Sequence, residues 1–143
     1  MLQLIGIAGK AGTGKDSAGY YLEDVWGYRS CAFADPIKHG LMQMFDLDDS
    51  QLWGNQKEDV VASMGKSPRQ LMQSLGDWGR SVDPELWLNM TGQILARMDH
   101  YVTLGHRGIV ITDVRYDNEA AFVRERGGVI IHIDRDDALP VHE

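Results

Sequence analysis

The residues with the clearest chemical potential lie near the start of the chain, in GIAGKAGTGKDS at positions 6–17. This stretch nearly matches the phosphate-binding pattern G-x-x-x-x-G-K-[ST], with Gly9, Gly14 and Lys15 in place. In such a loop, backbone N–H groups and the following helix N-terminus bind phosphate, and the lysine reaches the β and γ phosphates. We therefore predict a nucleotide-phosphate site, the alternative being a tight strand-to-helix turn with a solvated lysine. The predicted binding residues are Gly9, Lys10, Ala11, Gly12, Thr13, Gly14, Lys15, Asp16 and Ser17.

The match departs from the pattern directly after the lysine, where Asp16 replaces the Ser or Thr whose hydroxyl normally binds Mg²⁺. Ser17 cannot simply substitute, because one helical residue turns the side chain by about 100°. A carboxylate is a better ligand than a hydroxyl for this hard cation, although it adds negative charge near phosphates. Asp16 is therefore interpreted either as a Mg²⁺ ligand, direct or through water, or as an acid favoured by the helix dipole.

A second acid, Asp113, ends the apolar stretch GIVIT. Ligands in open α/β sheets gather at the carboxyl ends of strands, so an acid at this position is suited to holding Mg²⁺. The predicted metal residues are thus Asp16 and Asp113, and the alternative role of Asp113 is to cap the following turn. Arg115 follows two residues later, in DVRYDNE.

Arginine side chains supply the candidates for a second phosphate. Arg69 and Gln73 are spaced i, i+4 in SPRQLMQSLGDWGR, so they share a helix face, and Arg80 lies just past the predicted helix. Guanidinium groups match phosphate oxygens in two-point contacts. The alternative is that these arginines are ordinary surface charges of an acidic domain. The histidines at 39, 100 and 106 show no metal-ligand spacing.

Alternating strands and helices must position these residues. Apolar runs predict strands at 2–8, 28–34, 108–115 and 129–133, and helical patterns occupy 15–26, 35–45, 67–78, 83–98 and 117–128. Continuous apolar strands that alternate with helices indicate a parallel sheet covered on both faces. The predicted fold class is therefore α/β, with a parallel sheet flanked by helices.

Several helix ends are marked in the sequence. Three predicted helices place an N-cap residue directly before a proline, and Ser67 with Gln70 also fits a capping box. Gly127 is expected to stop the helix at 117–128 as its C′ residue. A stripe on the helix at 83–98 is most simply core, and it consists of Trp87, Met90, Ile94 and Met98.

Composition limits the classes of protein that this chain can belong to. Its 143 residues suffice for one domain, and the polar stretch at 46–66 is expected to be a lid or insertion. A net charge of −7 lacks the basic footprint of a duplex nucleic-acid binder. Cys31 is the only cysteine, which fits a reducing cytoplasm. The N-terminus has neither the pattern of a signal peptide nor a membrane span, which needs about 20 apolar residues.

Taken in order, the motifs resemble those of the bacteriophage deoxynucleoside monophosphate kinases. The resemblance covers almost the whole chain and rests on GKAGTGKDS, FADPIK, SPRQLMQSLGDWGR, WLNM, ITDVRYDNEAAFVRERGGVIIHIDR and a final HE. This family characteristically carries G-K-D-[ST], so the resemblance makes Asp16 a family trait. It implies a three-layer P-loop kinase fold with a parallel sheet flanked by helices. It also implies that the chain uses ATP and Mg²⁺ to phosphorylate a deoxynucleoside monophosphate, and that Lys15 belongs to the donor site.

The resemblance also implies roles for residues later in the chain. Residues in motifs around the acceptor and the phosphates are Arg69, Gln73, Asp113 and Arg115, with Arg80 as a further candidate. Arg135 is expected to contact the ATP base or phosphates, and the expected catalytic residues are Lys15, Arg69 and Arg115. Two alternatives stay open: a P-loop kinase for another phosphorylated small molecule, and a nucleotide-binding protein without turnover. Which bases are accepted is not determined by the sequence.

The chain departs from the family at its end. The family normally continues past HxSE or HxTE into another strand and helix, whereas this sequence stops at Val141, His142 and Glu143. We expect either a shortened version of a longer protein or a chain that covers the exposed edge by self-association, as in a homodimer. In either case residues 136–143 are expected to be loosely held.

Overall fold

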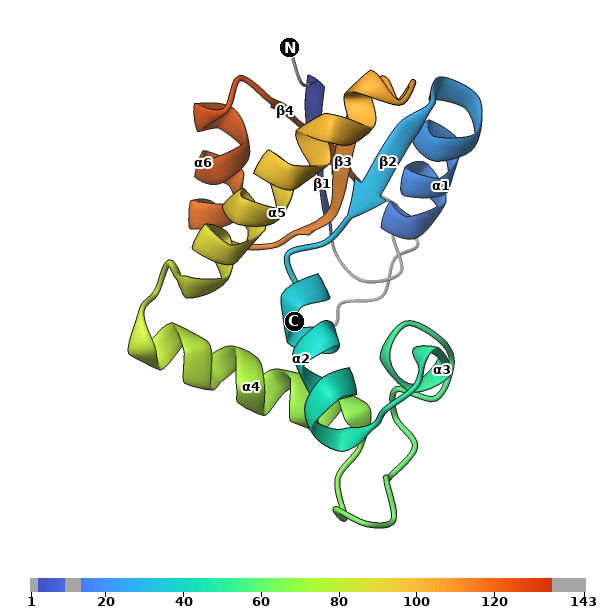
Figure 1. Cartoon of the computed structure of the whole chain (residues 1–143), viewed down its shortest axis with the longest axis vertical. Helices are drawn as coiled ribbons and strands as arrows, with labels where there is room; N and C mark the ends of the chain where they lie inside the picture. Colours follow the sequence, from blue (N-terminus) through green and yellow to red (C-terminus); the bar gives the residue numbers. More distant parts are fainter. Residues whose placement is uncertain (1–2, 10–13, 135–143) are drawn as a thin grey trace. The chain divides into compact units, whose positions relative to one another are not determined.

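The computed structural model describes residues 3–9 and 14–134 of the chain (Figure 1). The chain divides into two compact units, one of Met1–Phe33 with Thr91–Glu143 and one of Ala34–Met90. The first unit contains the β-sheet, and the described part of the second is mainly helical. That the whole chain acts as a single kinase domain stays a prediction.

The first unit is built on a four-stranded sheet with the strand order β2-β3-β1-β4. The strands are β1 (Gln3–Gly9), β2 (Tyr28–Cys31), β3 (Gly108–Val114) and β4 (Val129–Ile133). All three pairings are parallel, and in the central one Gln3 lies opposite Gly108. The four predicted strands are therefore present, and their parallel pairing is confirmed.

Helices cover both faces of this sheet. Ile7 and Val110 pack against Ala18 and Leu22 of α1 (Lys15–Trp26). The adjacent position in β1, Gly6, instead faces the side chain of Val123 in α6 (Asp117–Glu125). Because successive residues of a strand point to opposite faces, α1 and α6 lie on opposite sides of the sheet (Figure 1). The predicted three-layer α/β fold class is confirmed.

The edge strand β4 keeps apolar side chains exposed. Val129 is 59% exposed and Ile131 is 38% exposed. A row of unpaired backbone groups on such a strand is a template for pairing with another chain. Self-association and the loose hold on residues 136–143 stay predictions, since that last stretch lies outside the described residues.

The second unit contains α2 (Asp35–Phe45), α3 (Asp49–Leu52), α4 (Pro68–Val82) and the first residues of α5 (Leu86–Thr103). Its core is formed by Ile37 and Leu41 of α2 together with Leu47 and Leu52. Two of these four residues come from the stretch 46–66, which therefore anchors itself in the core. That this stretch acts as a lid stays a prediction.

The predicted caps are present in two cases of three. Ser67 caps α4 as expected: its hydroxyl accepts the N–H of Gln70 at 3.2 Å, and the Gln70 side chain accepts the N–H of Ser67 at 2.9 Å. Asp83 has the extended backbone expected before a proline, and its carboxylate accepts the N–H of Glu85 at 2.9 Å, although the regular helix α5 begins only at Leu86. The predicted cap of α2 is wrong by one residue, because Ala34 has helical backbone angles and the helix already includes Asp35.

The helix stop at Gly127 is confirmed. Helix α6 ends at Glu125, and Gly127 follows with φ 76°, a left-handed backbone that glycine adopts without strain. Its N–H donates to the carbonyl of Arg124 at 3.0 Å. This is the C′ geometry that the sequence predicts.

The predicted stripe of α5 is only partly confirmed as core. Met98 is buried and Trp87 packs, partly buried, against the core, but Met90 is 40% exposed. The most buried positions are Leu88, Thr91, Leu95 and Met98. Neighbouring rows of a helix can both be apolar, and helical spacing alone does not choose between them.

Helix α4 is longer than predicted and contains two glycines where the chain approaches itself closely. It runs to Val82, so Arg80 lies in its last turn and not past its end.

Trp87 packs against α4 at these glycines. A Cβ at Gly79 would lie 2.5 Å from Cε2 of the Trp87 ring. The Trp87 indole N–H also donates to the carbonyl of Gly76 at 3.0 Å. The lack of a side chain at Gly79 therefore allows Trp87 to pack against α4.

We predict that Gly79→Ala destabilises the protein. The added methyl group overlaps a rigid ring, and overpacking of this kind costs about 1–3 kcal/mol, more than the gain of about 0.5–1 kcal/mol in helix propensity. Ser74→Ala, an exposed position of the same helix, is the matched control and is expected to stay within about 0.5 kcal/mol of the wild type. Urea unfolding measures both, and a Gly79→Ala protein as stable as the wild type would contradict the packing argument.

Candidate functional site

The glycine-rich loop has the structural context that a phosphate loop requires. Strand β1 ends at Gly9 and helix α1 begins at Lys15, so the loop joins a central strand to a helix N-terminus. Lys10, Ala11, Gly12 and Thr13 lie outside the described residues, as does Arg135. For the described part, the predicted order of strand, loop and helix is present.

Gly14 sets the direction of the first turn of α1. It is the N-cap, with φ 99°. No described atom lies within 4 Å of a Cβ built at this position, so a side chain would not clash. Glycine is favoured here because other residues rarely adopt this left-handed backbone angle. Its carbonyl accepts the N–H of Ala18 at 3.0 Å, which closes the first helical turn. N–H groups at such a helix start, together with the dipole, form a site for anions.

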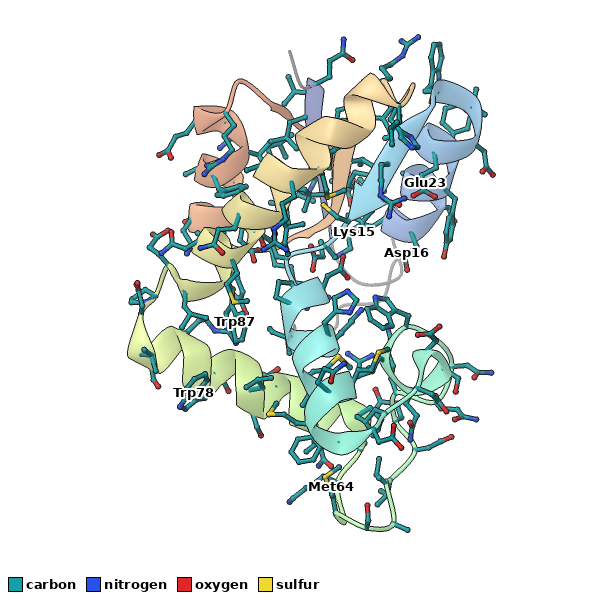
Figure 2. The ribbon with its side chains drawn as sticks, in the orientation of Figure 1. Lys15, Asp16, Glu23, Met64, Trp78 and Trp87 are labelled. Carbon is teal, nitrogen blue, oxygen red and sulfur yellow. The ribbon has the colours of Figure 1, made fainter. Side chains whose placement is uncertain are left out.

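The next three residues occupy this first turn. Lys15 is partly buried, whereas Asp16 and Ser17 are exposed. Figure 2 shows Lys15 and Asp16 at the start of α1. The exposed carboxylate of Asp16 is accessible to a cation at the helix N-terminus. It is also where an acid interacts favourably with the dipole, so both interpretations of Asp16 stay open.

The carboxyl ends of β1 and β3 lie side by side. Ala8 of β1 pairs with Val114 of β3. The loop after Gly9 and the side chain-bearing residue Asp113 therefore lie at the same, carboxyl end of the sheet. Helix α1 packs over this end, since a Cβ at Gly19 would lie 2.8 Å from the Thr112 side chain. The structure thus brings the start of α1 and Asp113 to the carboxyl end of the sheet, where α/β proteins bind ligands.

Asp113 makes a part-buried contact within the same unit. Its carboxylate accepts the backbone N–H of Phe33 at 2.7 Å. Phe33 is buried and meets the ring of Phe122 edge to face, with 5.5 Å between ring centroids. This contact ties Asp113 to a segment that is distant in sequence.

Glu119 was not predicted as a site residue, yet it organises the segment that carries Arg115. Its carboxylate accepts the backbone N–H groups of Arg115 at 2.8 Å and Tyr116 at 3.0 Å, while the Arg115 side chain is exposed. Burial raises the pKa of Glu119, the two N–H groups oppose that shift, and the charge of Asp113 adds to it. The signal available in the sequence was a glutamate at the third position of a helix.

Arg69, in the second unit, is exposed and forms an ion pair with Glu58. Its backbone N–H also donates to the carbonyl of Lys57 at 2.9 Å. Both partners come from the stretch 46–66, so this stretch determines the position of the first turn of α4. A phosphate that binds Arg69 competes with the Glu58 carboxylate.

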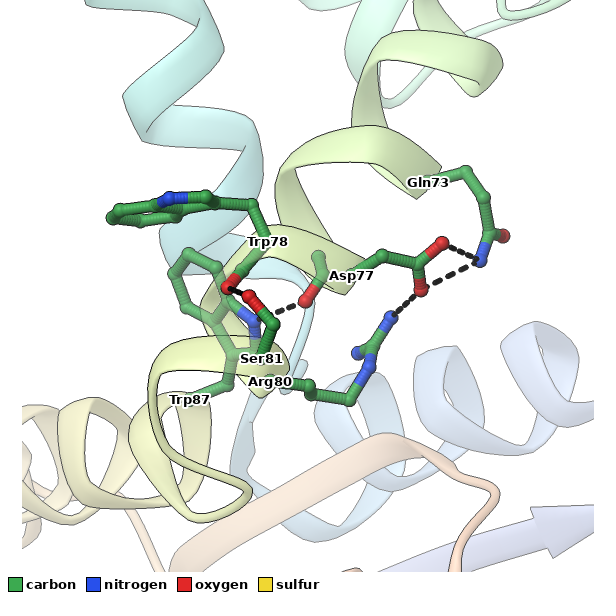
Figure 3. Close-up of polar contacts among 7 residues, drawn as sticks. Gln73, Asp77, Trp78, Arg80, Ser81 and Trp87 are labelled. Atoms are coloured by element: carbon green, nitrogen blue, oxygen red, sulfur yellow. Dashed lines mark hydrogen bonds and ion pairs between the residues drawn. The ribbon is translucent and has the colours of Figure 1, made fainter.

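Gln73 and Arg80 meet at a third residue of α4, Asp77 (Figure 3). The Gln73 amide nitrogen lies 3.2 and 3.3 Å from the two carboxylate oxygens, and Arg80 Nη2 lies 2.8 Å from one of them. Arg80, with a smaller contribution from Gln73, holds the pKa of Asp77 below its usual value. The sequence analysis did not single out Asp77, although its spacing of four from Gln73 and three from Arg80 is the spacing of helix neighbours.

Other features of the described residues add few candidates. No group of three or more His, Cys, Asp or Glu side chains that could hold a metal ion occurs among them. His39 packs against the ring of Trp53, with centroids 5.2 Å apart. No helix in the described part of the chain is long and apolar enough to cross a membrane.

Comparisons with known proteins agree with this geometry. A family model described as "Deoxynucleotide monophosphate kinase" matches residues 54–142. A protein of Acanthamoeba polyphaga mimivirus named "Putative deoxynucleotide monophosphate kinase" is 36% identical over 142 residues, which cover 92% of this chain and 74% of the viral protein. The "Deoxynucleoside-5'-monophosphate kinase" of Escherichia phage T5 is 37% identical over 95 residues, which cover 65% of this chain and 34% of the phage protein.

The matches confirm the family that the motifs indicate. The family model covers more than half of the chain and includes the helix with Arg69 and the strand end with Asp113. The mimivirus match extends over nearly the whole sequence. The chain therefore belongs to the deoxynucleotide monophosphate kinase family.

Proposed function

We propose that this kinase transfers the γ-phosphoryl group of ATP to the phosphate of a deoxynucleoside monophosphate and so forms the diphosphate. The observation that carries the proposal is the strand–glycine loop–helix unit, with Lys15 as the first residue of α1, in a chain of this family. This unit is suited to binding the phosphates of the donor. The guanidinium groups outside it provide for a second phosphate.

The residues of the chain supply positioning and charge, which is most of what phosphoryl transfer needs. Lys15 and the N-terminus of α1 stabilise negative charge on the donor phosphates. Arg69 and Arg115 hold the acceptor phosphate, and Arg80 is a further candidate for this role. The acceptor phosphate is already ionised near neutral pH, so the reaction does not depend on a strong general base.

Magnesium would be held by the two acids at the edge of the sheet, Asp16 and Asp113. When bound, the ion neutralises charge on the donor phosphates and orients them. Carboxylate oxygens suit this hard cation, and a site that shares phosphates needs only one or two of them. Gly9, the loop residues 10–13, Ser17 and Arg135 complete the predicted donor contacts. Both substrates of the reaction are cytoplasmic metabolites, which supports placing the protein in the cytoplasm.

A coupled assay for diphosphate formation tests the proposal with ATP–Mg²⁺ and each of the four deoxynucleoside monophosphates. The wild type is expected to turn over at least one of them, and Lys15→Met is expected to lower kcat by a factor of about 10² or more, since a lost contact to transition-state charge costs a few kcal/mol. Lys66→Met, which removes an exposed lysine of the second unit, is expected to keep normal activity. Near-normal turnover by folded Lys15→Met would remove the phosphate-loop assignment, and ATP binding without any turnover would leave a nucleotide-binding protein.

Asp16→Asn separates the two interpretations of this residue. If the carboxylate holds Mg²⁺, activity falls and a higher Mg²⁺ concentration partly restores it; this is the result that we expect. If Asp16 only interacts with the helix dipole, stability falls by about 1 kcal/mol or less and the kinetics stay unchanged. Asp24→Asn, an exposed acid of the same helix, is the control, and a Mg²⁺ dependence identical in both variants would contradict the metal role.

Arg69→Ala and Arg115→Ala are expected to raise the KM of the monophosphate about tenfold or more. A hydrogen bond to a charged group contributes about 1.5–3 kcal/mol, and each variant loses at least one to the acceptor phosphate. The KM of ATP should change little. Arg124→Ala, an exposed arginine at the end of α6, serves as the control for lost surface charge. A KM increase confined to ATP would show that the donor and acceptor assignments are reversed.

A further inference from the structure

Asp77 holds two candidate acceptor residues on one face of α4. Its carboxylate accepts from the Gln73 amide four residues earlier and from the Arg80 guanidinium three residues later. All three side chains come from the same helix of the second unit. The question is what the arrangement does to Gln73.

The chemistry of the carboxylate determines which end of the Gln73 amide faces it. An ionised carboxylate only accepts hydrogen bonds, so the amide must turn its NH₂ group toward Asp77. Figure 3 shows this orientation, with the amide oxygen of Gln73 on the side away from Asp77. Gln73 therefore presents a hydrogen-bond acceptor to its surroundings.

Arg80 also binds the exposed Asp77 carboxylate. Its Nη2 lies 2.8 Å from one Asp77 oxygen and beside Gly76, where a Cβ would be 2.9 Å from the same nitrogen. The carboxylate is thus bound by a charge pair and by an amide.

We propose that Asp77 is a positioning residue that directs the Gln73 amide oxygen toward a hydrogen-bond donor on the nucleoside part of the acceptor. The inference rests on the proposed function and refines it. A phosphate dianion offers acceptors only, so the outward amide oxygen of Gln73 does not bind phosphate. The donors available on a deoxynucleoside monophosphate are an N–H group of the base and the 3′-hydroxyl. On α4, the arginines then bind the phosphate, and the Gln73 oxygen accepts a hydrogen bond from the nucleoside.

Asp77→Asn tests the orientation because it inverts the amide instead of removing it. The asparagine oxygen can still accept from Arg80, while its NH₂ group donates to the Gln73 oxygen and turns the Gln73 NH₂ group outward. Two donors then face each other in the complex. We expect the KM of the monophosphate to rise about tenfold, with the KM of ATP, kcat and the midpoint of thermal unfolding close to those of the wild type.

A double-mutant cycle with Gln73→Met tests whether Asp77 acts through Gln73 or has a general structural role. If Asp77 acts through Gln73, then Asp77→Asn adds nothing further to the KM of the Gln73→Met protein, and the double-mutant cycle is strongly non-additive. Asp59→Asn removes an exposed acid of the same unit and is expected to leave both KM values unchanged.

Substrates distinguish the two donor groups. If the donor is the 3′-hydroxyl, 2′,3′-dideoxynucleoside monophosphates have a raised KM with the wild type and are insensitive to Asp77→Asn. If the donor is a base N–H, the dideoxy substrates remain sensitive, to an extent that differs among the bases. Either result supports the proposal and names the group that Gln73 reads.

Three results would overturn it. The first is an unchanged monophosphate KM in Asp77→Asn. The second is an equal rise in KM when Asp77→Asn is added to Gln73→Met. Either of these, with a wild type that is active, refutes the positioning role alone. The third is a wild type that turns over none of the four monophosphates, which would refute the proposed function and this inference with it.

Discussion

The parallel pairing of β1 with β3 is the constraint on which the first unit depends. Parallel strands send their carboxyl ends to the same edge, so the loop after Gly9 and the acid at Asp113 become neighbours although they are about a hundred residues apart in sequence. Glycine at position 14 then lets the chain turn into α1 with φ 99°, which brings the N-terminus of that helix to the same edge. These two features bring the start of α1 and Asp113 to the same end of the sheet.

Carboxylates hold the candidate acceptor residues in the absence of substrate. Glu58 pairs with Arg69, Asp77 holds Gln73 and Arg80, and Glu119 fixes the backbone at Arg115. Exposed ion pairs contribute little to stability, so a phosphate can replace such an acid as the partner of an arginine. The acids thereby keep flexible side chains in defined positions within a protein of net charge −7.

Family membership and the contacts on α4 address different levels of specificity. Both relatives are named as monophosphate kinases. The region that the family model matches includes α4. What the contacts add is the orientation of one amide on that helix. Asp77 turns the NH₂ group of Gln73 toward itself because an ionised carboxylate accepts hydrogen bonds and does not donate them.

Local signals in the sequence were sufficient for the four strands and for most of the helices, but not for the short helix α3 (Asp49–Leu52). Apolar runs predicted all four strands, and the residues of α1 matched the prediction from Lys15 to Trp26. The capping box at Ser67 and the stop at Gly127 were also correct, because caps and left-handed glycines depend on a few neighbouring residues. Motif order along the chain was enough to identify the family.

Tertiary structure decided the features that depend on distant partners. Helical spacing left two apolar rows on α5, and packing buried the row with Leu88 and Leu95 while it left Met90 exposed. Gly79 had no local reason to be glycine; the reason is the Trp87 ring, which lies against it. Asp113 likewise accepts the backbone N–H of Phe33, a residue eighty positions away in sequence. A sequence specifies each residue's conformational preferences, but which side chains meet depends on how the strands pair and the helices pack, and only the folded chain shows that.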